Sequence, residues 1–313
     1  MTAAYRSDRR CTEIQKTYHV NTNPDRNKEA LRWNRTAWLR VFLWTAAIFA
    51  TVPVARSVQR YVYDTIGKDF FTYMVLFIFM SLLVALVYFL LFRSAVKSAH
   101  QYTWLALSAG AYIYTTLQLR ENPEEAGHLL QFGFLAYLLY GALSHRIRDW
   151  TVYITTLLFV LFIGILDEFI QWLTPERIWS YKDIGINAVA GVYFVLAVSK
   201  GIKPETVRGP VKRFSVSMLA GIITLNLLFL GLCLSNTPEA VKRYTSVFPE
   251  LSWLAQEETM TEYGQKEIAG TNPGRSKKLI TSFSLRTAWR LIIALIVSVW
   301  VCSEFWKRRL KKC

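Results

Sequence analysis

Cysteine is scarce in this sequence, with four residues in a chain of 313. In the topology expected below, Cys11 and Cys313 face the cytosol, whereas Cys233 and Cys302 lie near opposite ends of different apolar segments. These positions support neither a disulfide framework nor a zinc site. The sequence also lacks a Gly-rich phosphate loop, a nucleophile elbow, metal-ligand spacing of His and Cys, and internal repeats. We therefore expect no metal and no cofactor.

Charged residues are also sparse, at 19% of the chain, whereas hydrophobic residues make up 53%. The apolar residues are gathered in blocks of about 20, the length that an α-helix needs to cross a bilayer. This pattern excludes an ordinary soluble domain and predicts an all-α, polytopic helical membrane protein with about eight transmembrane helices. We expect these helices at 37–55, 70–92, 101–119, 126–144, 151–172, 183–199, 214–234 and 287–306. The third and sixth are the least apolar, because Tyr, Thr, Gln and Asn dilute them.

The distribution of Lys and Arg predicts the orientation in the membrane. With the N-terminus inside, the inner segments 1–36, 93–100, 145–150, 200–213 and 307–313 hold eight, two, two, five and five basic residues. The short outer loops hold three, one and two. We therefore expect both termini in the cytosol of a multi-pass cell-membrane protein, with a bacterial cytoplasmic membrane as the expected location.

The net charge of +15 is spread over the segments that flank the membrane rather than over one recognition surface. This spread argues against a nucleic-acid partner and for contact with anionic membrane lipids. Residues 1–36 are interpreted as a flexible, basic cytosolic tail without the apolar core of a cleaved signal peptide. Two transmembrane helices are expected within 37–100 and two more within 201–313, the latter separated by an extracytoplasmic insertion at 235–286.

Polar side chains gather at the outer end of the fifth expected helix. Thr151 to Leu166 carry no charge and rise about 24 Å, which places Asp167 and Glu168 near the outer boundary of the hydrocarbon. Glu168 and Gln171 share one helix face, whereas Asp167 points about 100° away. A short loop with Arg177 follows.

The sixth expected helix presents a complementary stripe. Asp183, Asn187 and Gly191 recur at intervals of four residues and therefore share one face. Ala190 and Gly191 are small enough to permit close helix packing. Ionisable residues inside a membrane segment need partners, so the two polar stripes together predict a functional site.

We expect the fourth helix to form a third side of this site. Asn122-Pro123-Glu124-Glu125 is a typical helix start, with Asn as the cap, and the two carboxylates are explained by capping. His128 follows one turn into the membrane. A hydrogen-bonded packing histidine and a member of the site are both open interpretations of it.

Three segments together resemble the VanZ-like family of membrane proteins: 128–135 (HLLQFGFL), 167–177 (DEFIQWLTPER) and 183–191 (DIGINAVAG). The resemblance covers about 101–200, and it implies a VanZ-like transmembrane domain there. By this resemblance, the positions that are characteristic of the family correspond to His128, Glu168, Gln171, Arg177, Asp183, Asn187 and Gly191. The family is named for a protein linked to teicoplanin resistance, so the resemblance implies a role in the cell envelope or in antibiotic resistance. The flanks of Arg177 depart from the family pattern, with Glu176 before it and Ile178-Trp179 after it.

Two interpretations of the cluster remain open. Interhelical polar contacts in bilayers average well under about 1 kcal/mol, and one or two suffice as a clasp between helices, so five at one face favour a site. Arg177 can bind a phosphate or carboxylate head group, and Glu168 or His128 can relay a proton.

The first function class is a non-catalytic protein that binds a lipid-linked envelope precursor, a glycopeptide or another amphipathic ligand at the outer face. The second is an enzyme that acts on a lipid-linked head group by acid/base transfer or hydrolysis, with its catalytic residues unassigned. A transporter is disfavoured because the polar residues gather at one face rather than at the midplane.

Overall fold

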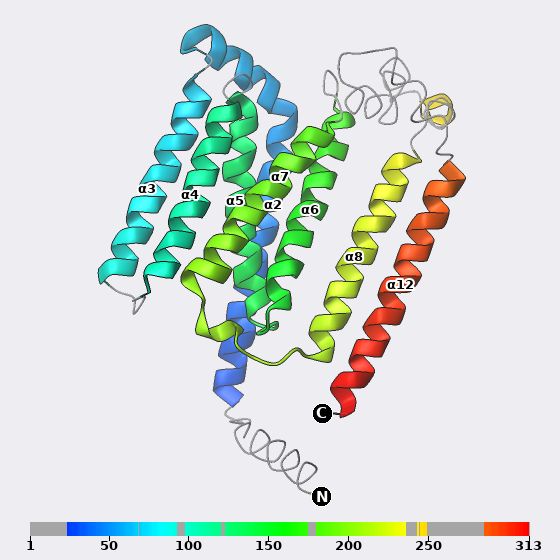
Figure 1. Ribbon diagram of the computed structural model, residues 1–313. Coiled ribbons are helices and arrows are strands. Elements are labelled where there is room, and N and C mark those ends of the chain that lie inside the picture. The colour runs from blue at the N-terminus through cyan, green and yellow to red at the C-terminus, as the bar shows by residue number, and fades with distance from the viewer. Residues whose placement is uncertain are drawn as a thin grey trace, which may run out of the picture.

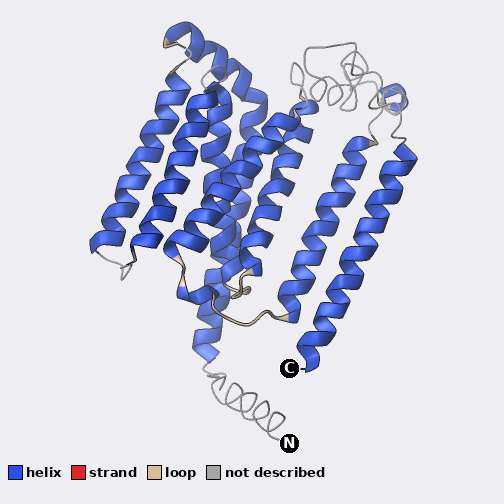
Figure 2. Ribbon diagram, in the orientation of Figure 1, coloured by secondary structure: helices blue, strands red, loops and turns tan. Residues whose placement is uncertain are grey.

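The computed structural model describes residues 24–67, 69–92, 98–119, 123–174, 180–235, 243, 245–248 and 285–312. Within this part of the chain all regular structure is helical and no strand occurs (Figure 2). Eight long helices dominate: α2 (Pro24–Thr65), α3 (Phe70–Phe92), α4 (Ala99–Gln118), α5 (Pro123–Ser144), α6 (Thr151–Trp172), α7 (Tyr181–Leu196), α8 (Arg213–Leu234) and α12 (Leu285–Lys312). The predicted all-α fold is confirmed.

The eight helices lie side by side and alternate in direction, so that α2 begins at the same end of the bundle at which α12 finishes (Figure 1). Among the described helices, seven are long and apolar enough to cross a membrane, which makes this a multi-pass membrane protein. The remaining helix, α4, is the third one expected from the sequence. It is less apolar because His, Gln, Tyr and Thr interrupt it, yet it runs alongside α3 and α5.

The observed bounds follow the apolar runs closely. α3 has no charged residue in its 23 positions, and α3 and α6 begin and end where the sequence predicts. α7 starts two residues earlier than expected and continues as a π-helical turn, Ala197–Ile202, which is followed by a short 3-10 helix, Glu205–Val207.

The start of α2 differs from the expectation. Residues 24–36 are the first turns of α2 rather than a flexible tail, so that prediction is wrong for this part, and residues 1–23 lie outside the described residues. The helix continues past Pro53 to Thr65. Proline removes one backbone donor there, and Thr51 Oγ1 donates to the carbonyl of Ile48 at 2.6 Å. Most of the predicted insertion at 235–286 also lies outside the described residues.

α5 is the central helix of the bundle and packs against α2, α3, α6 and α7. Its apolar face provides the core through Leu129, Phe132, Leu135 and Leu139, all of which are fully buried. α8 packs on the opposite side of α6, and α12 packs chiefly on α8. The site end of α6 is thereby held from several sides, while α12 lies at the edge of the bundle.

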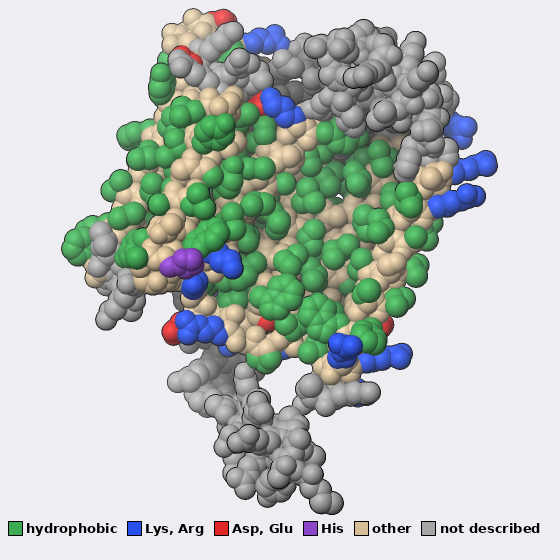
Figure 3. Space-filling model, viewed as in Figure 1, with side chains coloured by type: hydrophobic (Ala, Val, Ile, Leu, Met, Phe, Trp, Pro, Cys, Tyr) green, Lys and Arg blue, Asp and Glu red, His purple; other side chains and the backbone are tan. Residues whose placement is uncertain are grey.

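Apolar side chains cover the middle of the visible face, and charged side chains gather towards its two ends (Figure 3). Large hydrophobic side chains such as Phe77, Val84 and Val301 are 74%, 64% and 62% exposed. A belt of this kind is stable only in contact with lipid or with another apolar surface.

A buried carboxylate fastens the end of the bundle near the first residue of α6. Asp149 accepts hydrogen bonds from the backbone N–H of Thr151 at 3.0 Å, from the Thr151 hydroxyl at 2.5 Å and from Ser215 of α8 at 2.6 Å. We call these three residues the Asp149 clasp. Sequence reasoning missed it, because the partner from α8 lies 66 residues away in the chain.

Candidate functional site

The last turns of α6 carry three buried polar side chains at the end of the bundle opposite the Asp149 clasp. Asp167, Glu168 and Gln171 are 1%, 0% and 4% exposed. We call them the acid–amide cluster. They lie there because 16 uncharged residues precede them in the same helix, so the α-helical rise carries them to the far end. Burial of two neighbouring carboxylates is costly unless other groups hydrogen bond to them.

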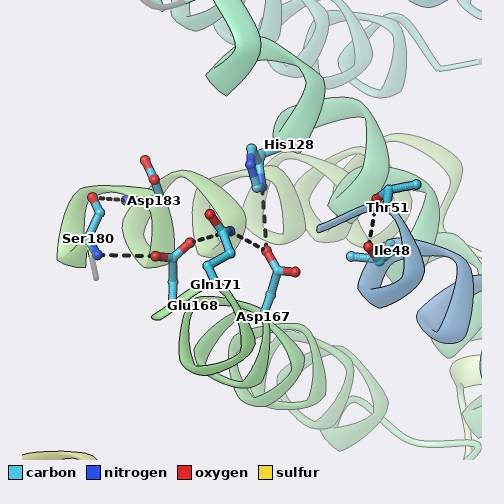
Figure 4. A network of polar contacts seen from close by, with 8 residues as sticks. All are labelled: Ile48, Thr51, His128, Asp167, Glu168, Gln171, Ser180 and Asp183. Carbon is cyan, nitrogen blue, oxygen red and sulfur yellow. Dashed lines mark hydrogen bonds and ion pairs between the residues drawn. The ribbon is translucent and has the colours of Figure 1, made fainter. Parts of the chain in front are cut away.

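Gln171 joins the two carboxylates (Figure 4). Its Nε2 donates to Asp167 Oδ2 at 3.0 Å and to Glu168 Oε1 at 2.9 Å. Positions four and three residues earlier on a helix both face the same turn, so one amide can reach both. The sequence predicted Glu168 and Gln171 as partners but left Asp167 out of the site. Asp167 nevertheless shares the amide of Gln171 with Glu168, because Gln171 lies within reach of both acids on the helix surface.

Glu168 also connects α6 to the start of α7. Its Oε2 accepts the backbone N–H of Ser180 at 3.1 Å, and the Ser180 hydroxyl accepts the backbone N–H of Asp183 at 3.2 Å. Ser180 is therefore the N-cap of α7, and Asp183 lies in its first turn, where a carboxylate is favoured by the helix dipole. Sequence reasoning missed Ser180, although a serine three residues before Asp183 is a recognisable cap.

His128 of α5 points towards the acid–amide cluster from the other side. Its Nδ1 lies 3.8 Å from Asp167 Oδ2, which is an ion-pair separation rather than a hydrogen bond. The imidazole stacks on Phe132, with ring centroids 6.2 Å apart, and the side chain is 21% exposed. The structure thus brings His128 to Asp167 on the side of the cluster away from Ser180.

Asn187, which the sequence predicted on the polar stripe with Asp183, makes no hydrogen bond to the acid–amide cluster. Its side chain is 0% exposed, and neither its Oδ1 nor its Nδ2 hydrogen bonds to any described residue. It instead packs against Gly164 of α6, where a Cβ atom would lie 3.1 Å from Asn187 Cβ. The two helices approach closely at this point.

One turn further along α7, Gly191 faces α6, where the sequence predicted close helix packing. Ala190 is buried in the core, and a Cβ atom on Gly191 would lie 3.1 Å from both Leu157 Cδ1 and Val160 Cγ1. A side chain at this position would displace Leu157 and Val160 by a few tenths of an ångström, so glycine allows the two helices to approach closely.

The remaining predicted residues lie at the edge of the site. Arg177 falls in 175–179, outside the described residues. The first position of α5 is Pro123, as predicted. Glu125 pairs with Lys182 of α7 at 2.9 Å, so this carboxylate links two helices rather than serving only its own helix start.

The arrangement offers buried hydrogen-bonding groups rather than a cluster of metal ligands. Among the described residues, no group of three or more His, Cys, Asp or Glu side chains is placed to hold a metal ion. The acid–amide cluster offers carboxylate acceptors, and His128 beside Asp167 can exchange a proton.

No protein-family model, curated protein or solved structure matches this chain. The fold and the buried side chains define a polytopic helical membrane protein with an acid–amide cluster at one end. The resemblance to the VanZ-like family rests on the sequence segments alone.

Proposed function

We propose that this chain is a VanZ-like membrane protein that binds a lipid-linked envelope component or another amphipathic ligand where α5, α6 and α7 meet. Through that binding it modulates the cell envelope or the susceptibility to glycopeptide antibiotics. The observation that supports this best is the burial of Asp167 and Glu168 around one shared amide, Gln171. Ionisable side chains buried within a membrane protein are expensive and are a mark of functional sites.

A comparison with the Asp149 clasp supports a role beyond packing. That clasp fastens α6 to α8 with one carboxylate and three short hydrogen bonds from two residues. The opposite end of α6 has two buried carboxylates, a nearby histidine and a buried asparagine. One or two polar contacts suffice to hold membrane helices together, so the larger group exceeds what packing requires.

The site belongs to the outer face in the proposed topology. α2 begins and α12 ends at the other end of the bundle (Figure 1), and the positive-inside bias of the sequence assigns that end to the cytosol. A ligand in the outer leaflet would then meet the acid–amide cluster with its head group.

An enzyme acting by acid/base transfer on a lipid-linked head group is the second candidate. The observation that favours it is the 3.8 Å separation of His128 Nδ1 and Asp167 Oδ2. A histidine next to a carboxylate is a common arrangement for proton transfer. The two candidates differ in whether Glu168→Gln abolishes turnover or weakens binding.

The test uses cells that express Glu168→Gln, Asp183→Asn or Arg177→Lys, with glycopeptide sensitivity and envelope-lipid composition as readouts. Each value is normalised to the amount of folded protein in the membrane. Asp149→Asn is the matched control, because it alters a buried carboxylate at the other end. We expect all three site variants to lose function while Asp149→Asn keeps it. Wild-type behaviour from all three at normal abundance would reject the proposal and leave a helix clasp.

A further inference from the structure

Three helices meet at the end of the bundle opposite the acid–amide cluster. The Asp149 clasp connects the start of α6 to Ser215 of α8 at 2.6 Å. Trp150, the residue before α6, stacks on Trp306 of α12, with ring centroids 6.0 Å apart. α8 and α12 also pack against each other. The start of α8 and the last turns of α12 therefore form one continuous surface.

Positive charge is in excess at this surface. Glu304 of α12 forms an ion pair with Lys307, and it also interacts electrostatically with Arg308 and with Arg213 of α8. Three cations thus surround one exposed carboxylate. Asp149, a second acid at this end, is buried, and both of its oxygens accept hydrogen bonds within the clasp. Arg213 and Arg308 are exposed, so the excess charge faces the surroundings of the protein.

The needs of the helices themselves do not account for this charge. Lys212 and Arg213 lie at the start of α8, where the helix dipole disfavours cations. Arg309 differs from them, because it lies over the ring of Phe305, 4.7 Å from the centroid, and so has a partner within the protein. One exposed carboxylate cannot offset the three cations around it. An anion from outside the chain would therefore stabilise this surface.

Exposed apolar side chains border the same charges. Trp150 before α6, Phe214 of α8 and Phe305 of α12 are all exposed. Blue side chains at the lower ends of α8 and α12 lie next to apolar ones in Figure 3. Tryptophan is enriched at the level where lipid head groups meet acyl chains. The surface thus offers cations to a head group and apolar contacts to acyl chains.

We propose that the start of α8 and the end of α12 bind an anionic phospholipid, whose phosphate is held by Arg213 and Arg308 and whose acyl chains contact Phe214 and Phe305. Arginine suits a phosphate because its planar guanidinium presents paired donors. In the proposed topology this end lies in the cytoplasmic leaflet, whose anionic lipids attract basic segments. The site goes beyond the proposed function, because it lies at the other end of the bundle from the acid–amide cluster.

The experiment measures lipid binding to the purified full chain in detergent by native mass spectrometry. Phosphatidylglycerol is titrated against phosphatidylcholine, which carries the same phosphate but no net charge. We expect the wild type to bind phosphatidylglycerol at least about tenfold more tightly. Excess inorganic phosphate should leave the lipid in place, because it has no acyl chains. Equal binding of the two lipids, or displacement by inorganic phosphate, would overturn the proposal.

The decisive variant combines Arg213→Gln with Arg308→Gln. We expect its affinity for phosphatidylglycerol to fall at least about tenfold, since it loses two charges next to the phosphate. The matched control combines Arg286→Gln with Arg290→Gln, which removes the same number of exposed arginines from the other end of α12. The control should keep the affinity of the wild type. Equal weakening by both pairs would show general charge attraction in place of a site, and an undiminished affinity in the decisive variant would also overturn the proposal.

Glu304→Gln is a second test in the opposite direction. It removes the carboxylate that competes for the same cations, so the affinity for phosphatidylglycerol should rise several-fold. A purely structural role of the basic residues would not produce this gain. The variant also decides the question if the double arginine variant fails to fold, and an unchanged or weaker affinity would contradict the proposal. None of these results bears on the proposed function, which is tested by variants at the opposite end of the bundle.

Discussion

Gln171 is the side chain on which the arrangement of both site carboxylates depends. Its single amide nitrogen donates to Asp167 and to Glu168, so the two acids are fixed in orientation relative to each other. Hydrogen bonds to charged groups contribute about 1.5 to 3 kcal/mol each, more than those between neutral groups.

Gln171→Met should lower the free energy of unfolding by roughly 2 to 4 kcal/mol, because both buried carboxylates lose a donor while the volume is kept. The measurement is the Tm of the purified protein in detergent. Gln59→Met is the matched control, since Gln59 of α2 is partly exposed and donates only to Tyr63 at 3.2 Å. A Tm equal to that of the wild type would show that Gln171 does not hold the cluster.

A second residue-scale prediction concerns the Asp149 clasp. Asp149→Ala removes the acceptor from Thr151 and from Ser215, and it should cost about 2 to 4 kcal/mol. Asp149→Asn keeps one carbonyl oxygen and should cost about 1 kcal/mol. Denaturation of both variants in the same detergent checks the order, and equal stability of the two would contradict it.

At the scale of elements, α6 and α7 form the structural unit of the site. Their contact is set by two glycines, Gly164 of α6 beside Asn187 and Gly191 of α7 beside Leu157 and Val160. Small residues at such positions let helix backbones approach, which increases van der Waals contact in a bilayer. The position of Glu168 relative to Ser180 depends on this approach.

Gly191→Leu should separate the two helices and reduce both Tm and function, because its Cβ would already lie 3.1 Å from two side chains of α6. We expect a loss of about 2 kcal/mol or more, typical of an overpacked interface. Gly133→Leu on α5 is the control, since a Cβ atom there meets nothing within 4 Å. Equal effects of the two substitutions would show that the α6–α7 contact is not tight.

The elements were largely predictable from the sequence, and the contacts between them were not. The length and apolarity of each run define α3 and α6 to the residue, because a helix in lipid must satisfy its own backbone groups. The Glu168 and Gln171 pair followed from helical spacing. Asp167 was missed although it lies four positions before Gln171, which is a helical spacing. Its contact with His128 could not be predicted from spacing, because the two residues lie on different helices and 39 positions apart in the chain.

Asn187 also shows that the contacts between helices could not be predicted from the sequence. Its position on the stripe with Asp183 and Gly191 was predictable, since all three recur at intervals of four. Its lack of a hydrogen-bond partner was not, because that depends on the Gly164 backbone opposite it. Sequence periodicity gives a face of a helix, whereas the partner across the contact comes from the packing of the whole bundle.

At the scale of the whole molecule, the orientation in the membrane is the prediction that decides where a ligand meets the site. In a background without native cysteines, Val247→Cys should react with an impermeant thiol reagent added outside intact cells. Glu205→Cys should react only after the cells are opened. Both side chains are exposed, and they lie in segments at opposite ends of the bundle. The reverse pattern would move the acid–amide cluster to the cytosolic side.

The peripheral position of α12 has a consequence for biosynthesis. It packs chiefly on α8, where Trp289 and Trp300 donate to Ser235 at 2.8 Å and to Thr224 at 3.0 Å. The helices that form the site are all translated before α12 leaves the ribosome. Two separately encoded polypeptides, one ending after α8 and one supplying α12, should therefore reassemble in the membrane, with the indole hydrogen bonds guiding the second fragment to its place.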